Sequence, residues 1–447
     1  MVNVITDLFR YVIAILAVIY TLRCFTFYLA KSERKRRNMY RAQHSLMFIL
    51  HFMMYLIIFL NTRSMTVLIL YIAEICFFIA AMFIYSHIYR FASLLLINNM
   101  FFLLMIGFVM LTRLDETLAL KQFVIAVASM GLSLLVPFII EKAGFLSRMG
   151  LAYGLLGLLT VGSVFIFGRT VYGATNWVTI CGIGFQPSEI AKIIFVFFAA
   201  AMLYKNTSLK RIIFTSVIAA AYVLVLVVET DLGAAVIFFV TYVIMLYVAT
   251  RKFIWSALGL GAGASAAVVA YHLFSHVKRR VVAWTDPWGN YSDAGYQICQ
   301  SLFAICTGGW FGMGLYKGVP EDIPVVESDF IFSTIVEELG GIFGICLLLI
   351  YISCFIMFIN ISLQLTNNFY KILAVGLSVS YGFQFFLCIG GVIKFIPHTG
   401  VTLPLVSYGG SSILSTIVVF AVIQGLYQLK QKEVVISEKE ERAAGLR

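Results

Sequence analysis

The residues best placed to do chemistry lie between Asp293 and Gly341, a polar, glycine-rich stretch in an otherwise apolar chain. Near its end, Asp329 stands directly before the run FIFSTIVEELGG. A carboxylate at the edge of a membrane helix can serve as a general base. Asp329, Ser333 and Glu337 are four residues apart, so they would share one helix face. The alternative is that Asp329 or Ser328 only caps the helix.

A second candidate is the pair Glu189 and Lys192 in QPSEIAK. Pro187 is typical of a first helical turn, so a helix start with a local ion pair is one interpretation. The other is function, because an ion pair inside a membrane helix is costly unless it lines a cavity or binds a ligand. Asp231 in ETDLG is a rival carboxylate, but Thr230, Asp231 and Gly233 favour a turn between two helices.

Two segments could bind an anion. Lys278, Arg279 and Arg280 form a basic cluster in the polar loop at 274–330, and planar Arg suits phosphate. In SYGGSS, after Pro404, the backbone N–H groups around Ser407 and Gly409 could bind phosphate. The similar segment GGWFGMG is not a nucleotide loop, because no strand precedes it.

Composition restricts the class of protein. The chain is 62% hydrophobic and 12% charged, which excludes an ordinary soluble domain. An outer-membrane barrel would alternate apolar and polar residues, and this chain does not. The formal charge of +11 comes from basic residues between apolar runs, which membrane topology explains better than nucleic-acid binding. The eight cysteines form no CxxC and the six histidines no HExxH, so no metal site is assigned to them.

The apolar runs predict an all-α polytopic membrane protein with about thirteen spanning helices. They are at 11–30, 45–60, 65–88, 92–111, 122–140, 149–167, 189–204, 211–228, 232–250, 254–273, 331–357, 370–390 and 405–427. The basic block at 31–41 should be cytoplasmic, which places the N-terminus outside. Alternation then puts the loops 112–121, 168–188, 274–330 and 391–404 outside, with the Lys278–Arg280 cluster against the positive-inside tendency. That departure suggests an anionic ligand.

Eight pieces of the sequence resemble the SEDS family, the FtsW, RodA and SpoVE group of peptidoglycan polymerases. In order they are GATNW (173–177), FQPSEIAK (185–192), TDLG (230–233), RRVVAWTDPW (279–288), GYQICQS (295–301), GGWFGMGL (308–315), SDFIFSTIVEELG (328–340) and GVTLPLVSYGGSS (400–412). The chain departs from the family at Thr175, Asn176, Thr230, Val325 and Cys388, and a usual His-Thr pair is Glu327 and Ser328 here.

The resemblance implies a ten-helix core at 92–430 with an outer loop at 274–330. Residues 1–91 would be about three extra N-terminal helices, and 431–447 a cytoplasmic tail. It implies polymerisation of lipid II at the outer face of the bacterial cytoplasmic membrane, in division, elongation or sporulation. Asp329 would be the general base of an inverting transfer. Substrate would be bound by Arg279, Arg280, Gln297, Glu189, Lys192, Ser407 and Gly409.

The expected partners are a class B penicillin-binding transpeptidase and other proteins of the division or elongation complex, with no nucleic acid. No cofactor is certain, although a divalent cation, Mg²⁺ or Mn²⁺, could join one carboxylate to substrate phosphate oxygens. A lipid II transporter is the alternative, since many helices and intramembrane charges suit one too. A scaffold that only recruits a synthase fits the charged outer loop poorly.

Overall fold

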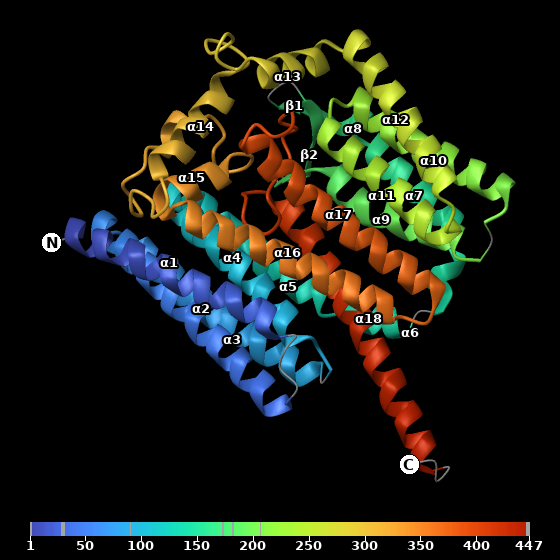
Figure 1. The fold of residues 1–447 in the computed structure, drawn as a ribbon, viewed down its shortest axis with the longest axis horizontal. Coiled ribbons are helices and arrows are strands. Elements are labelled where there is room, and N and C mark those ends of the chain that lie inside the picture. Colours follow the sequence, from blue (N-terminus) through green and yellow to red (C-terminus); the bar gives the residue numbers. More distant parts are fainter. Residues whose placement is uncertain are drawn as a thin grey trace.

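A computed structural model describes residues 2–27, 32–89, 91–142, 144–171, 174–180, 183–205 and 207–443. Within them, twelve helical segments are long and apolar enough to cross a membrane. A further helix, α9 (Pro187–Leu203), has 17 residues and also lies among the spans. These long apolar helices confirm the expected all-α polytopic fold (Figure 1). Gly173 and Cys181 lie outside the described residues.

The first three helices form the N-terminal portion of the chain, and the fourth helix, α4, begins the remainder. The bounds are α1 (Val2–Thr26), α2 (Glu33–Thr62), α3 (Met65–Ile88), α4 (Leu94–Leu114), α5 (Glu116–Ser133), α6 (Val136–Lys142), α7 (Gly150–Gly162) and α8 (Val164–Phe167). The later helices are α10 (Leu209–Val228), α11 (Leu232–Thr250), α12 (Phe253–Leu273), α13 (Ser275–Thr285), α14 (Tyr296–Gly308), α15 (Ile331–Leu339), α16 (Gly341–Gln364), α17 (Asn368–Val392) and α18 (Gly410–Ala443).

Polar side chains attach the three N-terminal helices to the rest of the bundle. Tyr20 donates to Asn99 of α4 at 3.2 Å, and the Tyr55 hydroxyl lies 2.9 Å from Thr112 Oγ1. Between α2 and α3, the buried His51 lies 2.8 Å from Glu74. In a membrane the apolar surfaces supply little driving force for association, so such contacts and close packing fix the neighbours. As a result α4 is buried along nearly its whole length.

The apolar run predicted at 331–357 is not one helix. It is divided into α15 and α16 at Gly340, where φ is +92°. A Cβ at Gly340 would lie 2.4 Å from the backbone nitrogen of Gly312, so only glycine fits this crossing. The preceding loop is folded back on the break, with the N–H groups of Met313 and Gly314 donating to carbonyls of α15. These two hydrogen bonds hold the loop against the break between α15 and α16.

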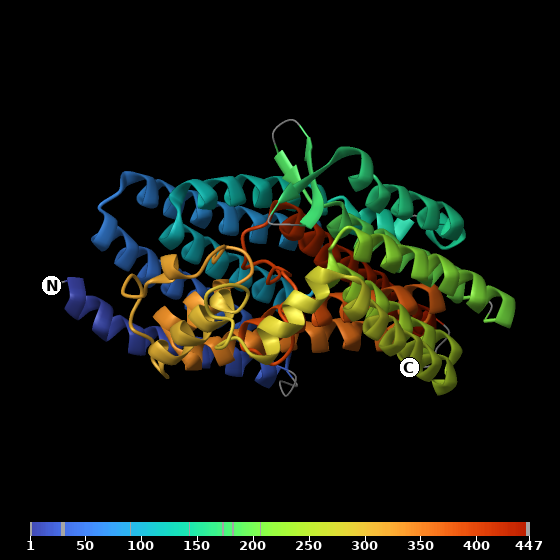
Figure 2. The ribbon, with the colours of Figure 1, turned by 90° about the horizontal axis from the view of Figure 1, so that it is seen from above.

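The predicted outer loop at 168–188 also contains regular structure. Three short strands, β1 (Gly168–Val171), β2 (Ala174–Ile180) and β3 (Ile183–Phe185), form an antiparallel sheet in that order. The sheet projects from the bundle in the view from above (Figure 2). It leads directly into α9, which carries part of the site described below.

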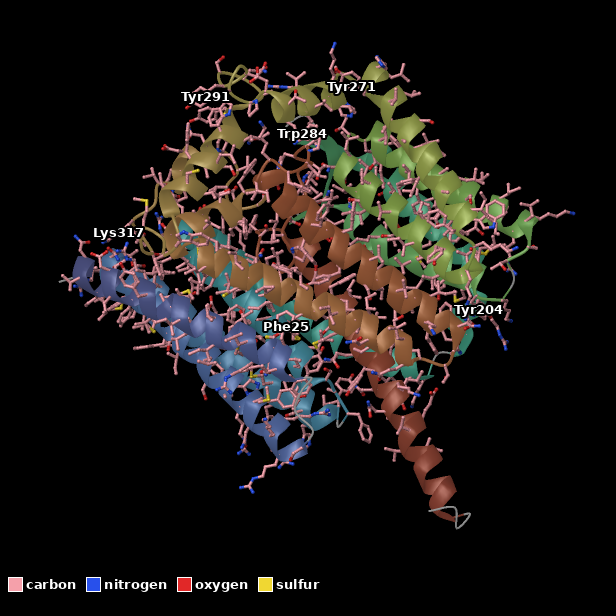
Figure 3. The ribbon with its side chains drawn as sticks, viewed as in Figure 1. Phe25, Tyr204, Tyr271, Trp284, Tyr291 and Lys317 are labelled. Atoms are coloured by element: carbon pink, nitrogen blue, oxygen red, sulfur yellow. The ribbon has the colours of Figure 1, made fainter. Side chains whose placement is uncertain are left out.

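One end of the bundle gathers the polar connections. The amino end of α1 contacts the 309–318 segment, because Arg10 donates to the Gly312 carbonyl at 3.1 Å and Lys317 pairs with Asp7 at 2.7 Å. Lys317, Tyr291 and Trp284 mark the course of the 274–330 loop over this end (Figure 3). The N-terminus and the long polar loop therefore share one end, as the topology requires. The carboxyl end of α18 extends from the opposite end (Figure 1).

Candidate active site

Asp329 lies in the turn just before α15, with its carboxylate partly accessible at 24% exposure. Ser328 Oγ donates to Oδ1 at 2.9 Å. On the other side, His398 Nε2 lies 3.7 Å from Oδ2. The backbone carbonyl of Asp329 accepts from the Cys388 thiol at 3.8 Å. The carboxylate thus accepts a hydrogen bond at Oδ1, has an imidazole near Oδ2, and remains partly accessible.

Two sequence interpretations of this region are corrected by the geometry. The N-cap of α15 is Phe330, with no side-chain cap, so neither Asp329 nor Ser328 caps the helix. The expected stripe of Asp329, Ser333 and Glu337 does not form either. Ser333 is buried 2.7 Å from Ser301, and Glu337 accepts from the Val319 N–H at 3.2 Å. Because Asp329 precedes α15, its four-residue spacing from Ser333 does not place the two side chains on one helix face.

Arg280 is the cation of the basic cluster that reaches Asp329. It lies on α13 and donates to the Thr399 carbonyl at 2.7 Å. At Gly400, where φ is +72°, a Cβ would lie 3.4 Å from Asp329 Oδ2 and 3.8 Å from Arg280 Nη2. Burial lowers the pKa of Arg280, and the negative charges of Asp231 and Asp329 oppose that shift. The guanidinium is therefore a half-buried positive charge in the field of two carboxylates.

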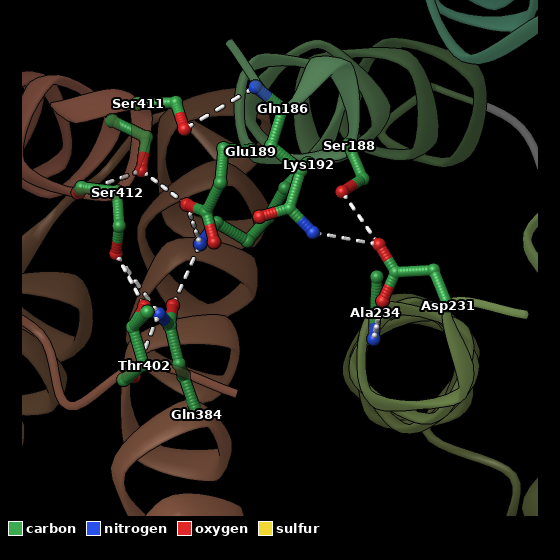
Figure 4. Close-up of polar contacts among 11 residues, drawn as sticks. Gln186, Ser188, Glu189, Lys192, Asp231, Ala234, Gln384, Thr402, Ser411 and Ser412 are labelled. Carbon is green, nitrogen blue, oxygen red and sulfur yellow. Dashed lines mark hydrogen bonds and ion pairs between the residues drawn. The ribbon is translucent and has the colours of Figure 1, made fainter. Parts of the chain in front are cut away.

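Glu189 and Lys192 form an ion pair inside the bundle. Lys192 Nζ donates to Glu189 Oε2 at 2.8 Å and to Gln384 Oε1 at 2.6 Å. Ser415 donates to the same Glu189 oxygen at 2.5 Å. Figure 4 shows how Gln384 of α17 reaches the pair from below, near Thr402. The pair joins α9, α17 and α18 at one point, so its residues are fixed by several helices at once.

Gly400 lies between the ion pair and Asp329. Glu189, Lys192 and Asp231 line a small pocket, and Gly400 lines it too. A Cβ at Gly400 would also lie within 4 Å of Asp329 and Arg280. The buried ion pair and the accessible carboxylate are therefore neighbours across this glycine.

Asp231 has two roles in the structure. As the N-cap of α11 its Oδ1 accepts from the Ala234 N–H at 3.1 Å, which confirms the turn interpretation. Its Oδ2 accepts from Gln186 and Ser188, both at 2.9 Å (Figure 4). Through these two hydrogen bonds the carboxylate forms part of the pocket wall. The sequence predicted only its role in the turn.

The SYGGSS turn does not present free amides for phosphate at the predicted residues. The Ser407 N–H donates to the Leu403 carbonyl, and the Gly409 N–H donates to Gln122 Oε1 at 3.1 Å. Ser407 Oγ donates to the Ser328 carbonyl, and the Tyr408 N–H donates to the Glu327 carbonyl. The turn holds the backbone immediately before Asp329, so its contribution is to position the carboxylate.

Two further predicted residues lie at the surface of the long loop. Arg279 is 63% exposed and pairs with Asp293. Gln297 donates to the Pro324 carbonyl at 3.2 Å and supports the segment that leads to Asp329. Neither lies beside Gly400, unlike Arg280. Sequence reasoning named Asp231 as a rival carboxylate but favoured a turn. The residues that it missed are Gln384, Ser415 and His398, because no local spacing connects them with Asp329.

The fold and the site define a polytopic membrane protein with a polar pocket at one end of its helices. The family model described as cell cycle protein FTSW_RODA_SPOVE matches residues 91–432. The chain belongs to this family. The match begins just after α3, so it leaves the three N-terminal helices outside.

Similar proteins carry names from the same family. The peptidoglycan glycosyltransferase RodA of Mycobacterium tuberculosis strain H37Rv is 33% identical over 351 residues, 71% of this chain and 74% of the relative. The probable peptidoglycan glycosyltransferase FtsW of Aliivibrio salmonicida is 34% identical over 272 residues, 58% of this chain and 68% of the relative.

Solved structures share the fold. A chain from a study of the structural coordination of polymerization and crosslinking by a peptidoglycan synthase complex aligns with a TM-score of 0.65 at 23% identity, covering 76% of this chain and 98% of that chain. The RodA crystal structure from Thermus thermophilus aligns with a TM-score of 0.56 at 23% identity, covering 75% and 96%.

Proposed function

We propose that this protein is a peptidoglycan glycosyltransferase that polymerises lipid II into glycan strands. The observation that carries the proposal is the accessible Asp329 carboxylate, which accepts from Ser328 and has the half-buried cation Arg280 across Gly400. A base and a cation side by side suit transfer of a sugar from a pyrophosphate. The family and the names of its relatives support the same activity.

In the proposed reaction, Asp329 is the general base. The acceptor's sugar hydroxyl is a weak nucleophile, and Asp329 takes its proton as the oxygen attacks the donor's anomeric carbon. The bond from that carbon to the pyrophosphate breaks, and the lipid pyrophosphate leaves with the electron pair. A single displacement inverts the configuration at the anomeric carbon. The energy comes from the activated pyrophosphate, so the step uses no nucleotide.

Arg280 stabilises the leaving pyrophosphate in this scheme. Its planar guanidinium binds phosphate oxygens in pairs, and its burial strengthens the interaction. Arg279 is exposed and already paired with Asp293, so it would at most attract the anionic substrate. The Glu189 and Lys192 pair lines the deeper pocket and fixes the helices that form its wall.

A divalent cation fits the site only in part. Among the described residues, no group of three or more His, Cys, Asp or Glu side chains could hold a metal ion. Glu189 and Asp231 already accept hydrogen bonds from protein donors. One carboxylate together with substrate phosphate oxygens would be the ligand set for Mg²⁺ or Mn²⁺, and such an ion would neutralise pyrophosphate charge.

The test is polymerisation of purified lipid II by the purified protein and by Asp329→Asn. Asn keeps the size of the side chain but cannot accept the proton, and general base catalysis contributes about 10²–10⁴-fold in rate. We expect loss of glycan product with unchanged yield and thermal stability. An active Asn variant contradicts the assignment of Asp329. Transport of lipid II by a wild type that makes no glycan favours the transporter instead.

We further propose that the site faces the outer side of the membrane and that the protein works with a single-pass class B penicillin-binding transpeptidase. The distribution of Lys and Arg motivates the first, and uncross-linked strands alone do not make a wall. In intact cells an impermeant thiol reagent should label Asn290→Cys and spare Asn38→Cys. Co-purification in mild detergent tests the partner, and full activity without any co-purified transpeptidase contradicts the coupling.

A further inference from the structure

His398 lies beside Asp329, and the proposed reaction has not used it. The residue belongs to the segment between α17 and α18, far from Asp329 in sequence. Its Nε2 lies 3.7 Å from Asp329 Oδ2, and its side chain is 15% exposed. The imidazole is thus a largely buried neighbour of the only oxygen of Asp329 that Ser328 does not bind.

The ring is held in this orientation by its surroundings. It stacks on Phe330, with ring centroids 4.4 Å apart and planes at 27°. On the other side it packs against α17, where a Cβ at Gly391 would lie 3.0 Å from His398 Nδ1. The next residue, Thr399, is fixed through its carbonyl by Arg280. These contacts leave Nε2 directed toward the carboxylate.

The environment of the two nitrogens selects where the proton sits. Nδ1 is buried and has no hydrogen-bond partner within the described part of the chain. Nε2 faces an acceptor oxygen. In the neutral ring one nitrogen carries the proton, and it is best placed where an acceptor stands. The proton on Nε2 therefore points at Oδ2 while the Ser328 hydroxyl binds Oδ1.

We propose that His398 is a positioning residue for the general base Asp329, an inference that rests on the proposed function. Its Nε2–H donates to Oδ2 once the substrate closes the site, because hydrogen bonds of this kind are often long in the unliganded enzyme. The bond turns the free lone pairs of the carboxylate toward the acceptor hydroxyl. In the reaction the hydroxyl proton passes to Asp329, and His398 keeps its own proton.

The experiment measures lipid II polymerisation by wild type, His398→Gln and His398→Leu at neutral pH. We expect His398→Gln, which retains an N–H donor, to keep kcat within about threefold. His398→Leu should lower kcat by about 10-fold or more with little change in KM. The split between kcat and KM, and the recovery by Gln, are readouts that a loss of folding alone would not produce.

A second pair of variants tests the position of the imidazole without changing His398. Gly391→Ala should displace the ring and lower kcat in the same way, whereas Gly261→Ala on α12, where a Cβ meets nothing within 4 Å, should not. The inference is overturned if His398→Leu keeps kcat within twofold, or if His398→Gln loses as much kcat as His398→Leu. A role in folding alone would lower yield and thermal stability together with kcat. If the wild type itself makes no glycan, it is the proposed function that fails.

Discussion

Replacement of Lys192 by Met should destabilise the protein because it leaves a buried carboxylate without its cation. The two side chains are only 7% and 12% exposed, and their atoms lie 2.8 Å apart. Removing one partner of a buried ion pair costs about 3–5 kcal/mol. Gln384 Oε1 also loses the donor that lies 2.6 Å from it, which adds roughly 1 kcal/mol.

The remaining partner reduces the loss. Glu189 keeps the hydrogen bond from Ser415 at 2.5 Å, so the lower part of the range, about 3 kcal/mol, is expected. For domains of 150–250 residues each kcal/mol shifts Tm by about 2–4 °C, and the shift is smaller for a larger chain, so about 3 kcal/mol predicts a fall of at most roughly 6–12 °C here. The double variant Glu189→Gln, Lys192→Met removes the uncompensated charge and should recover at least half of that fall.

The double-mutant cycle is measured by thermal unfolding in one detergent. The proteins compared are the wild type, the two single variants and the double variant. Lys210→Met, at an exposed position on α10, is the matched control and should leave Tm within about 1 °C. Equal and additive losses in the single and double variants would refute the ion-pair reasoning. If the double variant is stable but does not polymerise lipid II, the pair also serves the reaction.

Much of the fold could be predicted because apolar length is a strong local signal. The runs of about twenty residues identified the spanning helices, and the basic blocks between them gave a consistent topology. The break at Gly340 was missed because the apolar run continues across it. Its cause is the close approach of Gly312, a contact that no pattern within α15 or α16 contains.

The sheet at 168–185 was missed for a different reason. Its strands have 4, 7 and 3 residues, too short for a clear alternation. Strand preference also depends on the partner strand and the surface it covers. Between two membrane helices, such a segment has the composition of an ordinary polar loop.

The site could be predicted only where chemistry and motif coincide in one segment. Asp329, Glu189 and Lys192 stand in recognisable pieces, and the structure places the ion pair in one pocket and Asp329 beside Gly400 of its lining. Arg280 could be suspected from charge in an outer loop, but its neighbour Arg279 carried the same signal and lies at the surface. Only tertiary packing distinguishes the two.

Three further outcomes follow from the site and its surroundings. Arg280→Lys should lose about 10-fold or more in polymerisation although the charge is kept, because an ammonium cannot pair two phosphate oxygens; a fully active variant would make it a surface charge. Gly400→Ala should cost about 1–2 kcal/mol in stability, since φ is +72°, and lower activity by placing a methyl 3.4 Å from Asp329; Gly261→Ala is its neutral control. Burial, and then the charge of Asp231, raise the pKa of Glu229 to about 8. In the folded protein Glu229 keeps its proton up to about pH 8, whereas in the unfolded chain it loses the proton near its usual pKa of 4.5. The stability that this proton supplies is therefore complete below pH 4.5 and is lost as the pH rises toward 8. Glu229→Gln should consequently match the wild type closely in Tm at pH 5 and have a higher Tm than the wild type at pH 8.5. The shift from 4.5 to about 8, at about 1.4 kcal/mol per pKa unit, corresponds to at most on the order of 5 kcal/mol in the free energy of unfolding. A difference in Tm that is the same at both pH values would show that the carboxyl does not titrate in this range.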